Sequence, residues 1–361
     1  IWNCYYFIAI LIGDRILECL QKLLRGLKNQ KLYAASGLFY TAILVGLNLV
    51  KVCYLKQGVT ALLQSNVISL YVTILLIVII EKRLRKVNLK CNYRAEQKEM
   101  LKYSAPLVPS TLSWWVMSAS DRYVIRWIIG NAANGIYSVS YKFPSILQTM
   151  FTMFNNAWTD MALAELGKGK QSEEYTKKIF KQLYQLSFGT VFILIPLTKL
   201  VMRLVLSESY KTAAIYIGFL YLGTAFQGFS SFCSIGYLHD KKTSGAAKTS
   251  VMGAVVNLGV DLLCINFLGL FAATISTFLG FFTMWIMRMR DIRETFPIKV
   301  DTINFSIYLC IGIVIATITI WSSDAIDIIL VLIASVFFLI NNKQVVKKAL
   351  AMAVKKIKRK E

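Results

Sequence analysis

Apolar runs of about 20 residues alternate with short polar segments along the whole chain, and an α-helix needs that length to cross a bilayer. Backbone polar groups must be satisfied inside the hydrocarbon, so such runs fold as helices. Eleven candidate spans cover residues 1–21, 37–55, 59–80, 105–129, 134–158, 183–206, 212–237, 246–265, 268–287, 303–321 and 325–341. The pattern predicts an all-α polytopic membrane protein with about 11 transmembrane helices.

The fourth and fifth spans carry charge near their middle, where a membrane helix tolerates it least. Helical periodicity gathers their polar side chains into one stripe on each span: Trp115, Ser118, Arg122 and Arg126 on the first, and Lys142, Thr149 and Asn156 on the second. Arg122 and Lys142 lie equally far from the link between the spans, which places both about 12 Å below the same surface. The two cations can therefore face one cavity.

Asp121 lies about 100° around the helix from Arg122, so it should point at a neighbouring helix. It would hold the cations in place, and a purely structural ion pair is one interpretation of this group. One carboxylate cannot neutralise three cations, however, so the positive excess predicts an anionic ligand. Trp115 either stacks on a sugar or prenyl chain or packs within the bundle.

Composition and charge placement exclude several classes of protein. The chain is 56% apolar with a mean hydropathy of +0.56, which is typical of membrane bundles. Its net charge of +22 does not indicate nucleic-acid binding, because most cations lie in alternate loops and in the tail. By the positive-inside rule these loops and the C-terminus are cytoplasmic. A single His and scattered Cys form no metal-ligand cluster, so no enzyme, cofactor or metal is predicted.

The first span also carries charge, at Asp14, Arg15 and Glu18. Their spacing allows local pairing of Arg15 with Glu18 on one helix, which is the favoured interpretation. Roles in ligand binding or in ion coupling, through Asp14, Glu18, Asp121 or Asp261, stay open.

Residues 37–80 and 246–287 share a pattern of a basic loop, a span containing Asn-Leu, and a second span that opens on Gly. Two lobes of like topology are typical of transporters. The expected division is 1–80 as the remainder of an N-terminal lobe with three spans, 81–104 as a basic cytoplasmic linker, 105–287 as a C-terminal lobe with six spans, 288–341 as two additional spans, and 342–361 as a basic cytoplasmic tail.

Residues 104–158 contain the most distinctive motifs of the chain. They are Pro106-x-x-Pro109, Ser118-Ala-Ser-Asp-Arg-Tyr123, Asn134-Gly-Ile-Tyr-Ser-Val and Phe154-Asn-Asn-Ala-Trp158. This stretch resembles the polysaccharide flippases of the O-antigen, capsule and exopolysaccharide type, in the multidrug/oligosaccharidyl-lipid/polysaccharide exporter superfamily. The resemblance extends over the whole chain as the last eleven of fourteen spans, so about three N-terminal spans are expected to be missing.

The resemblance implies transport of a polyprenyl-pyrophosphate-linked oligosaccharide from the inner to the outer leaflet of a bacterial plasma membrane, for lipopolysaccharide or other surface polysaccharide. A polysaccharide polymerase would be a partner. Arg122 and Lys142 are the expected pyrophosphate contacts, with Arg126 nearer the outer exit. The hydroxyl and amide groups of the stripes suit sugar hydroxyls.

A drug or lipid II exporter of the same superfamily is the nearest alternative. A drug exporter would usually attract organic cations to carboxylates, whereas the excess here is positive. A membrane polysaccharide polymerase or ligase should carry a sizeable outer loop, and the predicted outer links are only a few residues long.

Overall fold

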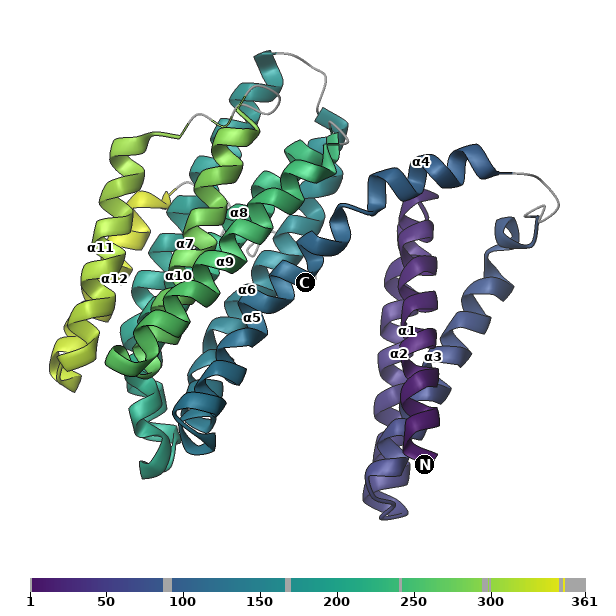
Figure 1. Cartoon of the computed structure of the whole chain (residues 1–361), viewed down its shortest axis with the longest axis horizontal. Helices are drawn as coiled ribbons and strands as arrows, with labels where there is room; N and C mark the ends of the chain where they lie inside the picture. Colours follow the sequence, from purple (N-terminus) through teal and green to yellow (C-terminus); the bar gives the residue numbers. More distant parts are fainter. Residues whose placement is uncertain are drawn as a thin grey trace, which may run out of the picture. The chain divides into compact units, whose positions relative to one another are not determined.

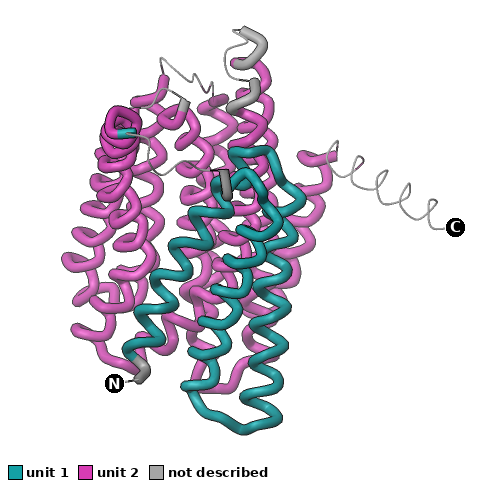
Figure 2. The backbone as a smooth tube through the Cα atoms, turned by 90° about the vertical axis from the view of Figure 1, so that its right-hand side faces the viewer, with its two compact units in different colours: residues 1–93 teal, residues 94–361 magenta. Residues whose placement is uncertain are grey.

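The structure, a computed structural model, describes residues 2–86, 93–165, 170–239, 242–293, 298, 300–343 and 347. Throughout these residues the chain is helical, with no strand (Figure 1). It divides into two compact units, residues 1–93 and 94–361 (Figure 2). The division falls within the basic segment expected to link two lobes. The tail from residue 348 onward, expected to be cytoplasmic, lies outside the described residues.

The first unit contains three long helices. They are α1 (Trp2–Gly26), α2 (Gln30–Asn48), which continues into a π-helical turn over Leu49–Tyr54, and α3 (Val59–Ile80), followed by a 3-10 turn over Lys82–Lys86. Helix α3 packs against both α1 and α2. The small core of the unit contains Leu17, Leu24, Leu70 and Ile77. Most other large apolar side chains of α1–α3 are exposed, as expected of helices that face lipid.

The second unit begins with the short polar helix α4 and continues with eight long helices. Their bounds are α4 (Arg94–Ser104), α5 (Leu107–Ile128), α6 (Asn131–Glu165), α7 (Lys170–Val205), α8 (Ile217–His239), α9 (Thr243–Leu268), α10 (Leu270–Asp291), α11 (Thr302–Trp321) and α12 (Asp324–Asn341), with a 3-10 turn over Glu208–Tyr216 before α8. Aromatic rings fill the centre of this unit, among them Phe188, Phe226, Phe229 and Trp285.

Helices α9 and α10 form the most extensive helix contact of the second unit because glycines let their backbones touch. A Cβ atom at Gly280 would lie 2.8 Å from the Cβ of Asn257 and 3.0 Å from the carbonyl oxygen of Gly253. Small residues are a common device for close helix packing in membranes, where lipid supplies no hydrophobic drive for association. This approach brings Asn257 into the interior of the unit.

The all-α membrane fold predicted from the apolar runs is confirmed. Among the described residues, eight helical segments are long and apolar enough to cross a membrane. Helices α1, α5 and α6 fall outside that set, and these three carry the mid-span charges Asp14, Arg15, Asp121, Arg122 and Lys142. Composition alone therefore misses the helices that carry the candidate functional groups.

The repeat pattern in the sequence has a counterpart in the packing. Helix α3 contacts both α1 and α2, and α10 contacts both α8 and α9, while the first two helices of each set contact each other less. The matched segments, α2–α3 and α9–α10, thus occupy corresponding places in two three-helix groups. The two-lobed organisation itself stays a prediction from the sequence.

Candidate functional site

Helix α5 presents its charges on a buried side and on an exposed side. Arg122 and Arg126 are exposed, whereas the adjacent Asp121 is only 2% exposed. The exposed side also presents Trp115, which lies near the ring of Tyr123 with centroids 6.3 Å apart. Trp115 does not pack in the core, because 54% of its surface is exposed.

Helix α6 adds Lys142, Thr149 and Asn156 to an exposed side of its own. A cation–π contact ties the two helices together, since the Arg122 guanidinium carbon lies 5.5 Å from the ring centre of Tyr141, the residue before Lys142. This contact brings Arg122 of α5 next to the residue that precedes Lys142 on α6, and the equal depth of the two cations stays a prediction. We call Arg122, Arg126 and Lys142 the cationic face.

The cationic face has no counter-charge in the part of the chain that the structure describes. No ion pair there involves Arg122, Arg126 or Lys142. Other cations of the same unit are paired, for example Arg203 with Asp324 and Lys211 with Glu208. The three cations of the cationic face differ in this from Arg203 and Lys211.

Hydroxyl groups beside the cations already donate within their own helices. Ser118 donates to the carbonyl of Trp114 at 2.9 Å, and Thr149 donates to the carbonyl of Ser145 at 3.0 Å. A hydroxyl oxygen that donates its hydrogen can still accept hydrogen bonds. These groups can therefore accept from sugar hydroxyls without being left unsatisfied when no ligand is bound.

Asp121 is held by three neutral groups from three other helices. Tyr137 of α6 donates to it at 2.6 Å, Thr277 of α10 donates at 2.6 Å, and the Asn257 amide of α9 donates at 3.3 Å. Asn257 also donates to Ser276 at 3.2 Å and accepts from Ser120 at 3.3 Å. The ion-pair interpretation of Asp121 is not what the contacts show: no described cation pairs with it, and it joins four helices instead.

Asp261 is a buried carboxylate near this cluster. It lies one turn after Asn257 on α9 and close enough to Asp121 for the two carboxylates to interact electrostatically. It is 0% exposed, and neither of its oxygens has a hydrogen-bond partner among the described residues. A buried carboxylate without a partner is costly, so this group needs a proton or a cation. The sequence signal is the spacing Asn257-x-x-x-Asp261 in an apolar helix.

The charges of α1 form a separate, local group. Arg15 pairs with Asp14 and with Glu18, both at 2.5 Å, and Lys22 pairs with Glu18 at 2.8 Å. All four side chains are well exposed, so the group is the local pairing that helical spacing favours.

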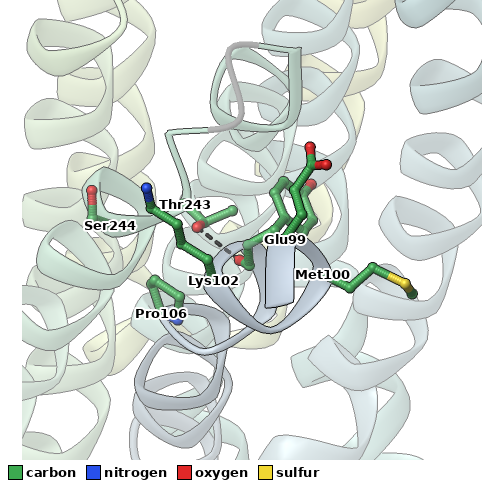
Figure 3. Close-up of a pocket in the computed structure, with 7 residues that line it drawn as sticks. Glu99, Met100, Lys102, Pro106, Thr243 and Ser244 are labelled. Carbon is green, nitrogen blue, oxygen red and sulfur yellow. Dashed lines mark hydrogen bonds between the residues drawn. The ribbon is translucent and has the colours of Figure 1, made fainter. Parts of the chain in front are cut away.

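The cavity in Figure 3, about 660 Å³, lies far from the cationic face. It is formed where α4 meets the start of α5 and of α9, with Lys102, Pro106 and Thr243 in its wall. The Thr243 hydroxyl donates to the Tyr103 carbonyl at 2.9 Å, the dashed contact in Figure 3, and so fastens α4 to α9. Pro106 precedes Arg122 by more than four helical turns, about 24 Å along α5. The cavity is therefore a separate feature.

Comparison with known proteins identifies the fold. Residues 2–159 match a family described as polysaccharide biosynthesis protein. No curated protein sequence matches the chain significantly. Solved structures similar to it include a MATE mutant (14% identity, 84% of this chain and 70% of that chain, TM-score 0.64) and the Vibrio cholerae MATE transporter VcmN (14%, 80% and 69%, 0.64). The lipid II flippase MurJ in an inward closed conformation is also similar (16%, 96% and 72%, 0.61).

The structural likenesses cover most of the chain at low identity and so establish its exporter fold. The family match covers α1 to α6 and includes the cationic face. The fold and the family match over residues 2–159 both agree with the motifs of residues 104–158.

Proposed function

We propose that this protein moves a polyprenyl-pyrophosphate-linked oligosaccharide from the inner to the outer leaflet of a bacterial plasma membrane during surface-polysaccharide assembly. The observation that carries the proposal is the cationic face, three exposed cations on membrane helices without a described carboxylate partner. Cations in hydrocarbon are costly, so they mark a site where an anion binds. The polysaccharide biosynthesis match supports the saccharide class of the cargo.

Different residues of α5 and α6 would bind the pyrophosphate and the sugars of such a cargo. Arg122 offers a planar fork suited to two phosphate oxygens, and its contact with the Tyr141 ring fixes where the guanidinium lies. Lys142 adds a mobile point charge. Ser118, Thr149 and Asn156 are placed along the same two helices to meet sugar hydroxyls, with Trp115 as a stacking surface. None of these groups needs to act chemically, because transport requires only binding and release.

A lipid II exporter is the second candidate, and the fold likeness to the flippase MurJ favours it. Its cargo would also carry a polyprenyl pyrophosphate, so the cationic face serves both proposals equally. A drug exporter for organic cations fits less well, since three unpaired positive charges would repel such a cargo.

The buried carboxylates offer a binding site for an ion whose gradient would drive this transport. Asp121 accepts hydrogen bonds from Asn257 and Thr277, both oxygens of Asp261 lack a partner among the described residues, and hard cations prefer oxygen ligands. We propose that this cluster holds a monovalent cation such as Na⁺ between its two carboxylates. A cation there would join α5, α9 and α10 and so link ion binding to the packing of the second unit.

Liposomes containing the purified protein test the transport proposal. A lipid-linked oligosaccharide is loaded, and its exposure to an external glycosidase is followed over time. Arg122→Ala and Lys142→Ala should each slow flipping at least tenfold. Lys211→Ala, which removes a lysine already paired with Glu208, should leave the rate unchanged. Equal rates for all four proteins would refute the role of the cationic face.

Thermal unfolding tests the cation proposal separately. Addition of NaCl in place of choline chloride should raise the Tm of the wild-type protein, and Asp261→Asn should remove that shift. Asp14→Asn, in the exposed cluster of α1, should retain it. A Na⁺ shift that survives Asp261→Asn would place the ion elsewhere.

A further inference from the structure

A second polar cavity lies where α7 and α12 meet, and the proposed transport does not use it. Its volume is about 480 Å³. Three lysines, four amide side chains and one apolar residue line it: Lys178, Lys181, Lys343, Gln182, Gln185, Asn341, Asn342 and Ile340. No carboxylate is among these lining residues. The cavity is therefore strongly positive and rich in hydrogen-bond donors.

The lysines of this cavity lack direct ion pairs among the described side chains. Lys181 borders a neighbouring cavity that contains Asp301. The pKa of Asp301 is lowered mainly by hydrogen bonds from Asn304, with smaller effects of Lys181 and Lys177. Asp301 thus caps the start of α11, because its side chain accepts a hydrogen bond from the backbone N–H of Asn304. Lys178 and Lys343 have no such neighbour described.

The amides of Asn341 and Asn342 already use one hydrogen each. They donate to the carbonyls of Phe337 and Phe338, at 2.9 and 3.1 Å. Each amide group has a second hydrogen, and the three ammonium groups have three each. A dense anion with several oxygens could satisfy this number of donors.

The position of the cavity along the helices points to a lipid rather than a soluble anion. Helix α7 has 36 residues, about 54 Å, so it extends well beyond a hydrocarbon core of about 30 Å. Lys178 and Lys181 lie in its third and fourth turns, toward the end of the bundle that the charge pattern predicts to be cytoplasmic. Beside them, α12 exposes an apolar row of Ile333, Val336 and Ile340, which are 61%, 56% and 68% exposed.

We propose that this cavity binds the phosphate headgroup of an anionic phospholipid from the adjacent leaflet, with the acyl chains lying along the exposed row of α12. Positive charge above an apolar surface is the arrangement that such an amphiphile requires. Basic pockets between transmembrane helices on the cytoplasmic side commonly take headgroups of this kind. The lipid would join α7 to α12, which together border the cavity. This site is independent of the proposed transport.

Native mass spectrometry of the purified full chain tests the proposal, with phosphatidylglycerol, cardiolipin and phosphatidylcholine as probes. The variant Lys178→Gln/Lys181→Gln/Lys343→Gln should bind the two anionic lipids at least tenfold more weakly, while phosphatidylcholine binding stays unchanged. The matched control, Lys98→Gln/Lys242→Gln/Lys248→Gln, removes three exposed lysines of the same unit and should bind like the wild type. An equal loss in both variants would show that only overall charge matters and would overturn the site.

A competition arm distinguishes a lipid from a soluble phosphate compound. Sodium pyrophosphate at millimolar concentration should fail to displace bound phosphatidylglycerol, because it gains nothing from the apolar row. Displacement at that concentration would assign the cavity to a soluble anion and overturn the lipid proposal. The Tm of both variants in lipid-free detergent should equal that of the wild type, so that weaker binding does not reflect unfolding.

Discussion

At the scale of single residues, helical geometry predicts which way a side chain points but not which residues it contacts. The 100° separation of Asp121 from Arg122 correctly aims the carboxylate at neighbouring helices. Its partners Tyr137, Asn257 and Thr277, however, come from distant parts of the sequence, and only the fold brings them together. Asp261 becomes conspicuous only when its unsatisfied oxygens are seen.

Arg288 lies just beyond the span predicted for residues 268–287, so the sequence alone does not predict that it is buried. In the structure it belongs to α10 and is 1% exposed. Its guanidinium donates to the Ser230 carbonyl at 2.7 Å and to Ser250 at 2.9 Å, and lies 5.5 Å from the ring centre of Trp114. A count of loop charges cannot tell a buried cation near a helix end from an exposed one.

The contacts of Asp121 predict the outcome of a double substitution. Arg122→Ala should abolish surface polysaccharide in cells at normal protein abundance, and Arg122→Lys should restore only part of it because the fork is lost. Adding Asp121→Asn to Arg122→Ala should not rescue it, since the hydrogen bonds of Asp121 come from neutral donors and no ion pair joins it to Arg122. Full recovery in the double variant would mean that the two side chains form a structural pair.

Glu81, just beyond the end of α3, gives a prediction about pH. Arg83 donates to its two oxygens at 2.7 and 3.0 Å, and Asn29 donates at 3.0 Å. These bonds, that of Arg83 above all, lower the pKa of Glu81 from 4.5 to about 2. Because the pKa of Glu81 is lower in the folded state, its ionised carboxylate stabilises the fold fully above pH 4.5, the pKa of the unfolded state. This contribution is lost as the pH falls from 4.5 through about 2.

Glu81→Gln should therefore lower the Tm at neutral pH, and the gap to the wild type should shrink as the pH drops below 4.5. Thermal unfolding of both proteins from pH 7 to pH 3 measures this gap. Glu96→Gln, on the polar helix α4, serves as a control without a Tm change. A gap that is constant over this range would show that Glu81 does not act through its charge.

At the scale of helices, the apolar runs predict existence and order correctly, but not length. Helices α6 and α7 extend beyond their predicted spans by several turns because polar sequence continues the helix past the membrane. The segment predicted as a basic linker contains a helix of its own, α4 over Arg94–Ser104. Hydropathy predicts the part of a helix that crosses the hydrocarbon, whereas the ends of the helix depend on capping and on tertiary contacts.

Lys199 of α7 connects this helix to the hairpin between α11 and α12. It is 0% exposed, donates to the carbonyls of Thr319 and Ser322 at 2.5 and 2.9 Å, and pairs with the equally buried Asp327 at 3.1 Å. Removing one partner of a buried pair leaves an uncompensated charge and costs about 3–5 kcal/mol. Lys199 thus adds a buried polar link to the packing of α11 and α12 against α7.

Lys199→Ala should therefore lower the Tm by on the order of 10 °C. Replacement of both partners, Lys199→Met with Asp327→Leu, should recover most of that loss, since no charge is left buried. Lys211→Ala, an exposed lysine of the same unit, provides the comparison and should change the Tm little. A double variant as unstable as the single one would show that the hydrogen bonds of Lys199, rather than its charge, join these helices.

At the scale of the whole molecule, the sequence predicts the class and the two-lobed plan because both follow from periodicity and charge. The repeat of residues 37–80 in 246–287 finds its counterpart in the packing of α3 and of α10. What the sequence could not provide is the division of charges within a lobe. Asp121 and the cations Arg122 and Arg126 share α5, yet the carboxylate is buried and the cations are exposed.

The distribution of loop charges predicts which end of the second unit faces the cytoplasm. Short links such as those at Ala132 and Ser323 carry few cations, whereas the segments around Lys98 and Lys242 are basic, and successive long helices of this unit alternate in direction (Figure 1). Single cysteines placed in a cysteine-free protein should react with a membrane-impermeant maleimide from outside intact cells at Ala132 and Ser323. Cysteines at Lys98 and Lys242 should react only after the membrane is opened. All four positions are exposed, so their reactivity depends only on the side of the membrane.

Labelling of Lys98→Cys or Lys242→Cys in intact cells would reverse the orientation. It would also move the lysine cavity between α7 and α12 to the outer leaflet, because that cavity lies at the same end of the unit as Lys242.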